Sequence, residues 1–228
     1  RQRQMCIRDR VDTIYVPAGD SLEIMPAVTI IFTGRFPLIV DTNAVLKAIG
    51  NETDSIVFTA QNHDLGYGGI RFLNSADGCT LNYCKMEYGI ARNDWDENNP
   101  VNYGGAIYCQ NSEVTILNSS IRNNRARFRG GAIYAENSKI IVENSEISHN
   151  SSREGGAIYL YNNEHTAIFS RNRIDNDSTL DNKGTICIDN SAAIFSNNII
   201  TGNSAINIMR MLYCRNSSPI LINNTIVA

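Results

Sequence analysis

The chain has 228 residues, of which 30 are Ile and 29 are Asn, whereas it contains one Trp and five Pro. Charged residues make up 19% and the formal net charge is −3, which excludes a disordered polyelectrolyte and a basic nucleic-acid-binding module. Asn is a turn former with poor helix propensity, so the composition also argues against a helical bundle.

Residues 1–10 (RQRQMCIRDR) differ from the rest of the chain. They are polar and basic, and they lack the apolar core of about 7 to 15 residues that a signal peptide requires. We interpret them as a non-native or disordered tail. The chain ends in mid-pattern, so we expect residues 11–228 to form a single domain that is truncated at its C-terminal end. No later run reaches the roughly 18 apolar residues of a membrane span.

Short segments in which apolar and polar residues alternate follow the tail, for example residues 22–24, 28–30 and 56–58. An alternation with a period of two indicates β-strands. We assign about two coils of strands to residues 11–59 and another to residues 69–86. The polar stretch 91–103 (ARNDWDENNPVNY) follows, and we expect it to leave the coils as an insertion.

The rest of the chain is a repeat. The sequence Gly-Gly-Ala-Ile-Tyr occurs at residues 104–108, 130–134 and 155–159, and degenerate copies continue near residues 184 and 211. Three apolar columns keep a period of about 26 residues over five copies. They are Ile107, Ile133, Ile158, Ile186 and Leu212; Ile116, Val142, Phe169, Phe195 and Leu221; and Ile121, Ile147, Ile174, Ile200 and Ile226.

A unit of about 26 residues with three short strands cannot bury its apolar face alone, so it must stack on its neighbours. A propeller blade needs roughly 40 to 50 residues, and the leucine-rich frame is absent. The pattern therefore predicts an all-β parallel β-helix of seven to eight coils, with the apolar columns filling its bore.

Stacking also explains most of the Asn residues. One column contains Asn118, Asn144, Asn197 and Asn223 and is interrupted by Arg171, and a second contains Asn124, Asn150, Asp177 and Asn203. Asn tolerates left-handed backbone angles, so we place both columns at corners of the coil.

Five cysteines remain outside the tail: Cys79, Cys84, Cys109, Cys187 and Cys214. Their odd number and the absence of a Cys-x-x-Cys pair argue against a disulfide framework and a zinc site. We expect them to be small buried residues.

The paired motifs Gly-Gly-Ala-Ile and Phe-x-x-Asn, the latter at residues 169–172 and 195–198, resemble the polymorphic outer-membrane protein repeat. The chain is more broadly similar to the pectin-lyase-like superfamily of right-handed parallel β-helices, which includes secreted polysaccharide lyases, glycoside hydrolases and surface adhesins. The resemblance implies a right-handed coil and an exported bacterial protein at the cell surface or outside the cell. Two of the five copies lack Gly-Gly, so the resemblance supports the fold and setting more than any single activity.

The insertion contains a candidate metal site. Asp94, Asp96 and Asn98 alternate along it and offer oxygen ligands of the kind that Ca²⁺ prefers. The Gly and the late Glu of an EF-hand loop are missing, so a solvated surface loop is the competing interpretation. We expect no required cofactor, with Ca²⁺ as the candidate ion.

Two further sets of residues are candidates for ligand binding. Arg125, Arg127 and Arg129 are spaced by two, so on an extended segment they point the same way and suit an acidic glycan. Tyr108, Tyr134 and Tyr159, with Tyr161 beside them, are expected to form an outward aromatic stripe. Such a stripe either stacks on sugar rings or packs on itself to stabilise the sheet.

These observations favour a non-catalytic exported rod that acts as an adhesin or as a scaffold binding a polysaccharide or a cell-surface protein, and not a nucleic acid. The alternative is a carbohydrate-active enzyme, a polysaccharide lyase or glycoside hydrolase. In the Gly-Gly-Ala-Ile strands only Glu136 and Asp189 are acidic among the positions expected to face outward, and they lie two coils apart. No catalytic residue can be assigned.

Overall fold

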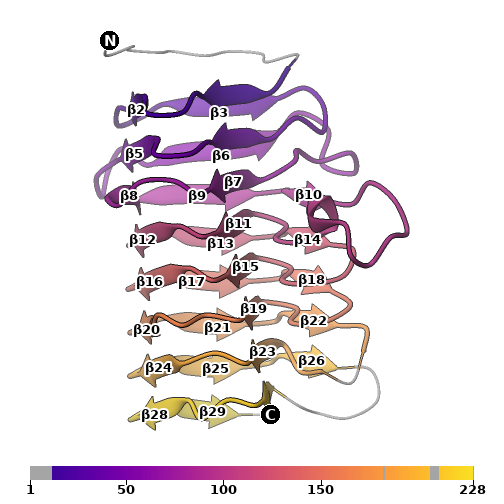
Figure 1. Cartoon of the computed structure of the whole chain (residues 1–228). Coiled ribbons are helices and arrows are strands. Elements are labelled where there is room, and N and C mark those ends of the chain that lie inside the picture. Colours follow the sequence, from indigo (N-terminus) through magenta and orange to yellow (C-terminus); the bar gives the residue numbers. More distant parts are fainter. Residues whose placement is uncertain (1–11, 182, 206–210, 228) are drawn as a thin grey trace.

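The computed structural model describes residues 12–181, 183–205 and 211–227, so the tail assigned to residues 1–10 lies outside the described residues. In the described part, eight coils stack into a rod (Figure 1). Every strand pair is parallel, as in a β-helix. Among the described elements, no helix has the length and apolarity needed to cross a membrane.

Each coil contributes one strand to each of three long sheets. The first sheet contains, in spatial order, β1 (Ile14–Val16), β4 (Leu38–Val40), β7 (Ile70–Leu73), β11 (Ile107–Gln110), β15 (Ile133–Glu136), β19 (Ile158–Tyr161), β23 (Ile186–Asp189) and β27 (Leu212–Arg215). The second contains β2 (Ser21–Ile24), β5 (Val45–Ile49), β8 (Cys79–Asn82), β12 (Glu113–Leu117), β16 (Lys139–Glu143), β20 (Ala167–Ser170), β24 (Ala193–Ser196) and β28 (Ile220–Ile222).

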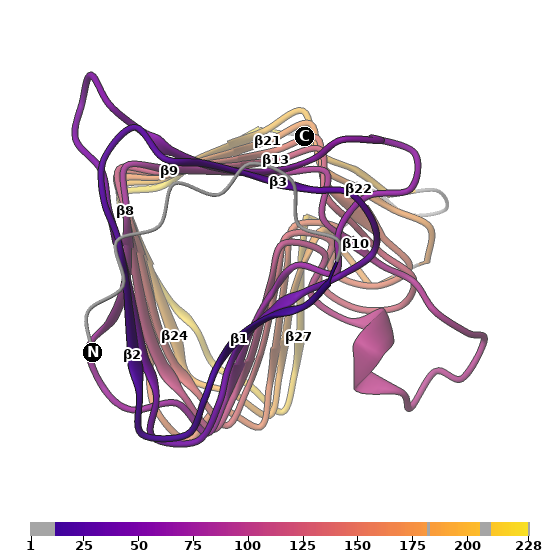
Figure 2. The same ribbon diagram turned by 90° about the horizontal axis from the view of Figure 1, so that it is seen from above.

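The third sheet contains β3 (Thr29–Phe32), β6 (Ile56–Ala60), β9 (Cys84–Glu87), β13 (Ser120–Arg122), β17 (Glu146–Ser148), β21 (Arg173–Asp175), β25 (Ile199–Thr201) and β29 (Thr225–Val227). A short sheet on the return path to the first sheet contains β10 (Ile90–Ala91), β14 (Arg125–Ala126), β18 (Ser151–Ser152), β22 (Ser178–Thr179) and β26 (Ser204–Ala205). Seen along the rod, the long sheets enclose a bore of roughly triangular section (Figure 2).

The three apolar columns predicted from the repeat are confirmed by the strand register. Ile107 pairs with Ile133, Val142 with Phe169, and the same pairing continues from coil to coil. Most of their side chains belong to one continuous core, in which the rings of Phe169 and Phe195 stack 4.8 Å apart, whereas Leu221 and Ile226 of the last described coil are 46% and 43% exposed. Like residues therefore contact like residues at the strand spacing of about 4.8 Å.

The Gly-Gly pairs mark the turn from the short sheet into the first sheet. Gly130 has a φ of 65°, and a Cβ on Gly131 would lie 2.0 Å from the carbonyl oxygen of Gly156 in the next coil. Only glycine allows the coils to approach this closely without a backbone shift.

The first Asn column lies at a corner in left-handed conformation, as expected. Asn118, Asn144, Asn197 and Asn223 have φ values between 46° and 56°, and Arg171 at the interrupted position has a φ of 55°.

The second column is placed differently from the expectation. The left-handed residues at that corner are Asn123, His149, Asn176 and Gly202, each one position earlier than the column. The column itself turns inward: Asn124, Asn150 and Asp177 are 1%, 1% and 0% exposed. They form a buried hydrogen-bonded ladder, because inward amides satisfy the backbone groups that the corner leaves unpaired.

The cysteines are free thiols in the described chain. Cys79, Cys84, Cys109 and Cys187 are buried, as expected, whereas Cys214 is exposed. Burial raises the pKa of the Cys84 thiol to about 12, so it stays protonated near neutral pH.

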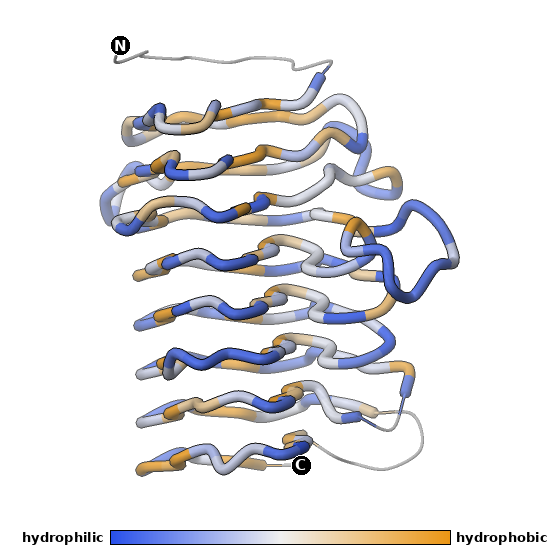
Figure 3. Tube along the Cα trace, in the orientation of Figure 1, coloured by the Kyte–Doolittle hydropathy of each residue, from blue (hydrophilic) through white to orange (hydrophobic). Residues whose placement is uncertain are grey.

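Residues 92–103 connect β10 to β11 and stand outside the bore beside the short sheet (Figures 1 and 2), whereas Ala91, the first residue of the predicted insertion, belongs to β10. Leu81 and Ile116 are register partners on adjacent strands, so the extra residues between them do not disturb the stacking. The insertion includes the 3-10 helix η1 (Pro100–Asn102), and most of it is hydrophilic (Figure 3).

Candidate functional site

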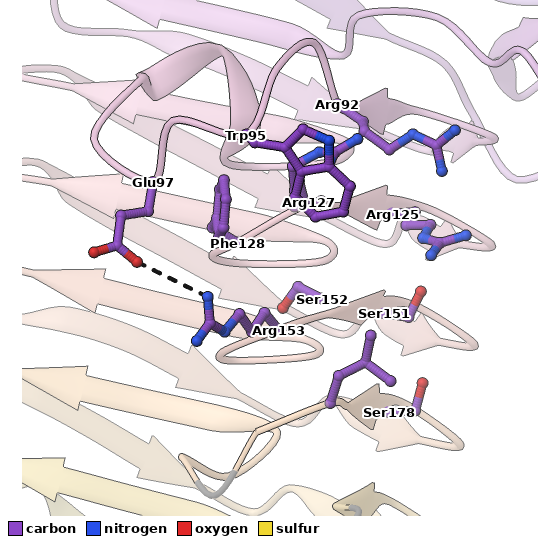
Figure 4. Close-up of a pocket in the computed structure, with 12 residues that line it drawn as sticks. Arg92, Trp95, Glu97, Arg125, Arg127, Phe128, Ser151, Ser152, Arg153 and Ser178 are labelled. Atoms are coloured by element: carbon purple, nitrogen blue, oxygen red, sulfur yellow. Dashed lines mark ion pairs between the residues drawn. The ribbon is translucent and has the colours of Figure 1, made fainter.

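A groove of about 710 Å³ lies between the insertion and the short sheet (Figure 4). Strands β14, β18 and β22 form its floor, and the insertion forms one wall. Its lining residues are Arg92, Trp95, Glu97, Arg125, Ala126, Arg127, Phe128, Ser151, Ser152, Arg153, Ser178 and Leu180. A concave site with aromatic and charged groups is the usual form of a ligand-binding site.

The insertion that forms the wall folds around Asn102, whose side chain is fully buried. Its amide donates to Asp94 Oδ1 at 2.6 Å and to the Asp96 carbonyl at 3.0 Å, and its oxygen accepts from the Asn93 amide at 2.8 Å. Asn99 caps η1 and donates to Asp94 Oδ2 at 2.7 Å. These local bonds fix the path of a segment that has little apolar packing of its own.

Arg71 on β7 ties the insertion to the rod. Its guanidinium donates to the carbonyl oxygens of Pro100, Val101 and Tyr103, at 3.3, 3.1 and 3.3 Å. Pro100 and Val101 belong to η1 and Tyr103 directly follows it, so one side chain of the rod binds the backbone of the insertion at three points. The attachment places Trp95 over the groove.

Trp95 and Arg127 stack on each other in the groove lining. The guanidinium of Arg127 lies 3.8 Å from the centroid of the Trp95 ring, and the ring itself is 84% exposed. Stacking of a guanidinium on an indole is favourable and leaves the other face of the ring open. The groove therefore presents a flat aromatic surface next to a fixed cation.

Positive charge is concentrated in the groove. In the described structure Arg92 and Arg125 form no ion pair, whereas Arg153 lies 3.8 Å from Glu97 and 3.4 Å from Asp181. Desolvation and the nearby Arg92 and Arg125 lower the pKa of Arg127, partly offset by Asp94. Like charges held this close favour an anionic ligand.

The third predicted arginine is separated from the other two. Arg129 is not in the groove lining; its guanidinium lies 5.1 Å from the Tyr103 ring and 5.5 Å from the Tyr159 ring, and 3.5 Å from Glu154. The structure thus brings Arg125 and Arg127 together and directs Arg129 into packing around the tyrosines.

Of the two alternatives for the tyrosine stripe, the structure shows a column that packs on itself. Tyr108, Tyr134 and Tyr159 are 1%, 1% and 2% exposed, and Tyr161 is half-buried. The rings do lie outside the bore and stack along the rod, with Tyr108 and Tyr134 centroids 5.4 Å apart. Tyr103 and Phe128, from the turns between copies, cover them and form a second apolar layer.

Oxygen atoms of the predicted calcium ligands Asp94 and Asp96 are occupied by hydrogen bonds within the insertion. Both oxygens of Asp94 accept hydrogen bonds from Asn99 and Asn102, and these bonds lower the pKa of its carboxyl. Asp96 Oδ1 accepts from the Asn98 amide at 2.9 Å. No group of three acidic, His or Cys side chains suited to a metal occurs in the described chain. Calcium binding here stays a prediction, and the ion would have to displace the two amides.

Sequence reasoning did not single out Arg92, Trp95 and Phe128 as groove residues. Arg92 and Trp95 lie at and within the insertion, whose path the 26-residue period cannot predict. One signal was available, because Trp95 is the single Trp of the chain and lies in a polar loop. Glu97 is the single carboxylate among the described lining residues, whereas glycoside hydrolases generally use two.

Comparisons with known proteins identify the fold. A family model described as "Right handed beta helix region" matches residues 39–226. No curated protein and no solved structure gives a significant match to the chain.

Proposed function

Because the chain belongs to the right-handed β-helix family and carries a cationic groove on an acidic rod, we propose that it is a non-catalytic binding scaffold for an acidic polysaccharide. The observation that carries this proposal is the set of Arg92, Arg125 and Arg127 beside the exposed ring of Trp95. Guanidinium groups pair with carboxylate or sulfate groups in two-point geometry, and an aromatic face stacks on a sugar ring.

The rest of the rod supports a scaffold role. The side chains at its repeated positions pack in the bore or form hydrogen bonds in the corner ladder. The coils therefore hold the groove residues on a rigid base. The Gly-Gly-Ala-Ile and Phe-x-x-Asn motifs support a setting outside the cell or on its surface, where acidic polysaccharides are accessible. A cell-surface protein with an acidic patch is the alternative partner, because it carries the same negative charge as an acidic polysaccharide.

The test is calorimetric titration of the protein with a uronate-containing oligosaccharide and with a neutral one of equal length. We expect the acidic oligosaccharide to bind and the neutral one not to bind. Added salt should weaken this binding, because the groove contacts are partly exposed. Trp95, as the single Trp, reports on the groove directly through its fluorescence. Equal affinity for the neutral oligosaccharide would contradict the proposal.

The enzyme alternative is tested in the same samples. Incubation with the acidic oligosaccharide is followed by assays for new reducing ends and for unsaturated uronides, with and without Ca²⁺. The proposed scaffold leaves the oligosaccharide intact. If turnover is observed and disappears in an Asp94→Ala, Asp96→Ala variant, the scaffold proposal is wrong and the protein is a carbohydrate-active enzyme.

A further inference from the structure

A second, smaller cavity adjoins the groove and shares Arg92 with it. Its volume is about 90 Å³, and Arg35 and Arg71 complete a set of three arginines in its lining. The remaining lining residues are apolar or neutral, so the lining contains no carboxylate. Three cations without a carboxylate in the lining are an unusual content for a cavity of this size, because like charges repel and the buried Arg71 has also lost its water.

Arg71 is the buried member of the set. It is 8% exposed, and it uses three of its five N–H donors on the carbonyls of the insertion. Its guanidinium lies 5.0 Å from the Tyr108 ring, and burial lowers its pKa to about 10, so it stays charged at neutral pH. Carbonyls and a ring satisfy hydrogen bonds but supply no counter-charge, and a buried unpaired charge is costly.

The second arginine, Arg35, is held by two separate segments. It donates from Nε to the Leu65 carbonyl and from Nη1 to the Arg92 carbonyl, both at 3.1 Å. Neither Arg35 nor Arg92 forms an ion pair with any described residue. Hydrogen bonds thus fix the side chains of Arg35 and Arg71 at the cavity, and Arg92 completes the lining.

The volume of the cavity limits the size of the ligand that fits inside it. About 90 Å³ corresponds to roughly three water molecules. That volume suits one small oxyanion and is too small for a sugar ring. We propose that this arginine cavity, lined by Arg35, Arg71 and Arg92, binds a single sulfate-type oxyanion. The anion is either free in solution or a substituent of a polymer that lies in the adjoining groove.

The site goes beyond the scaffold function and is tested without any polysaccharide. Calorimetric titration with inorganic sulfate, against a chloride background of constant ionic strength, is expected to show saturable binding of one anion. Arg35→Gln removes a charge-assisted contact and is expected to weaken sulfate at least about tenfold. The matched control is Arg122→Gln, which removes an exposed arginine on β13 paired with Glu87 and is expected to leave sulfate affinity unchanged.

Arg92→Gln provides a second variant of the same site, and thermal unfolding of each variant shows that it is folded. The proposal is overturned if sulfate gives no more heat than chloride. It is also overturned if both Arg35→Gln and Arg92→Gln bind sulfate as the wild type does. Either result would leave the scaffold proposal standing, because that proposal depends on acidic oligosaccharides in the groove.

A competition experiment distinguishes the two sources of the anion. If the cavity holds a substituent of the polymer, a sulfated oligosaccharide displaces inorganic sulfate and is itself weakened by Arg35→Gln. If the cavity holds a free anion, sulfate and the oligosaccharide bind together and Arg35→Gln leaves the oligosaccharide unaffected. Both results support an oxyanion site; displacement of sulfate by the neutral oligosaccharide as well would contradict it, since a neutral chain cannot replace the anion.

Discussion

The inward corner ladder and the groove lie on neighbouring parts of the same coils and satisfy their polar groups in opposite ways. In the ladder, the Asn150 amide donates to Ile121 O and Asp177 Oδ1, both at 2.9 Å, and its oxygen accepts from Asn124. In the groove, Arg92 and Arg125 have no ion-pair partner among the described residues. Polar groups that are satisfied within the fold stabilise it, whereas those left open are available to a ligand.

The comparison also separates residues that follow the repeat from residues that interrupt it. Arg125 is the register partner of Ser151, which pairs with Ser178 in the following coil. The column thus changes from Ser to Arg where the groove opens. The candidate binding residues lie at such interruptions, because the side chains at the repeated positions are already occupied by contacts between coils.

The largest expected effect on stability is the loss of Asn150. Asn150→Ala removes a side-chain amide that accepts from the Asn124 N–H and donates to Asp177 Oδ1 and the Ile121 carbonyl, and it leaves the buried Asn124 N–H and Ile121 carbonyl without these partners. We expect a decrease of about 3 kcal/mol or more in the free energy of unfolding, at about 1 to 3 kcal/mol per orphaned group. Urea unfolding measures it.

Asn98→Ala is the matched control for that prediction. Asn98 is an exposed Asn of the insertion whose side chain makes no bond in the described structure. We expect its effect to stay within about 0.5 kcal/mol. Equal losses in the two variants would remove the distinction between the ladder and the insertion.

Asp177 is the member of the ladder whose replacement is expected to stabilise the rod. Burial raises the pKa of its carboxyl well above the usual range, and its Oδ2 is buried without a hydrogen-bond partner. Asp177→Asn restores the amide that Asn124, Asn150 and Asn203 provide in other coils. We expect a gain of about 1 to 3 kcal/mol at neutral pH.

The pH dependence of this gain has a definite sign. Burial makes the carboxyl easier to protonate in the folded chain than in the unfolded chain, where it ionises near pH 4, so the wild type loses stability as the pH rises from about 4 towards the folded-state pKa. The advantage of Asp177→Asn should therefore shrink at pH 4 and grow at pH 7. Urea unfolding at the two pH values checks this, and a constant difference would contradict it.

Asn102→Ala is expected to have a smaller effect on overall stability and a large effect on the groove. Asn102 organises the insertion, which can unfold locally while the coils remain stacked. We expect the free energy of global unfolding to change by less than about 1 kcal/mol. Loss of the Arg127 guanidinium from the Trp95 ring should change the Trp95 fluorescence, and acidic oligosaccharide affinity should fall. Unaltered fluorescence would show that Asn102 does not hold the wall in place.

The sequence allowed the stacked coils to be predicted, but it did not allow the outer apolar layer that covers the tyrosines to be predicted. Ile107, Phe169 and Ile174 could be aligned because stacking forces one period on every coil. The same alternation placed Tyr134 correctly outside the bore. It could not show that Tyr103 and Phe128 bury that ring, because these residues belong to turns between copies.

The candidate site was predictable to the same limited extent. The insertion and the arginines Arg125 and Arg127 were identified from their departure from the repeat. The stack of Arg127 on Trp95 was not, because the contact depends on how Asn102 and Arg71 fold and anchor the loop. The second arginine cavity joins residues from separate coils, and no local pattern connects Arg35 with Arg92.

The central claim is that binding depends on the residues that interrupt the repeat. The most direct test compares Arg125→Ser with Arg122→Ser, two changes that convert an arginine to the serine of the next coil, at Ser151 and Ser148 respectively. Calorimetric titration with one uronate oligosaccharide should show at least about a tenfold loss for Arg125→Ser and wild-type affinity for Arg122→Ser. Equal affinities in the two variants, whether retained or lost, would contradict the account.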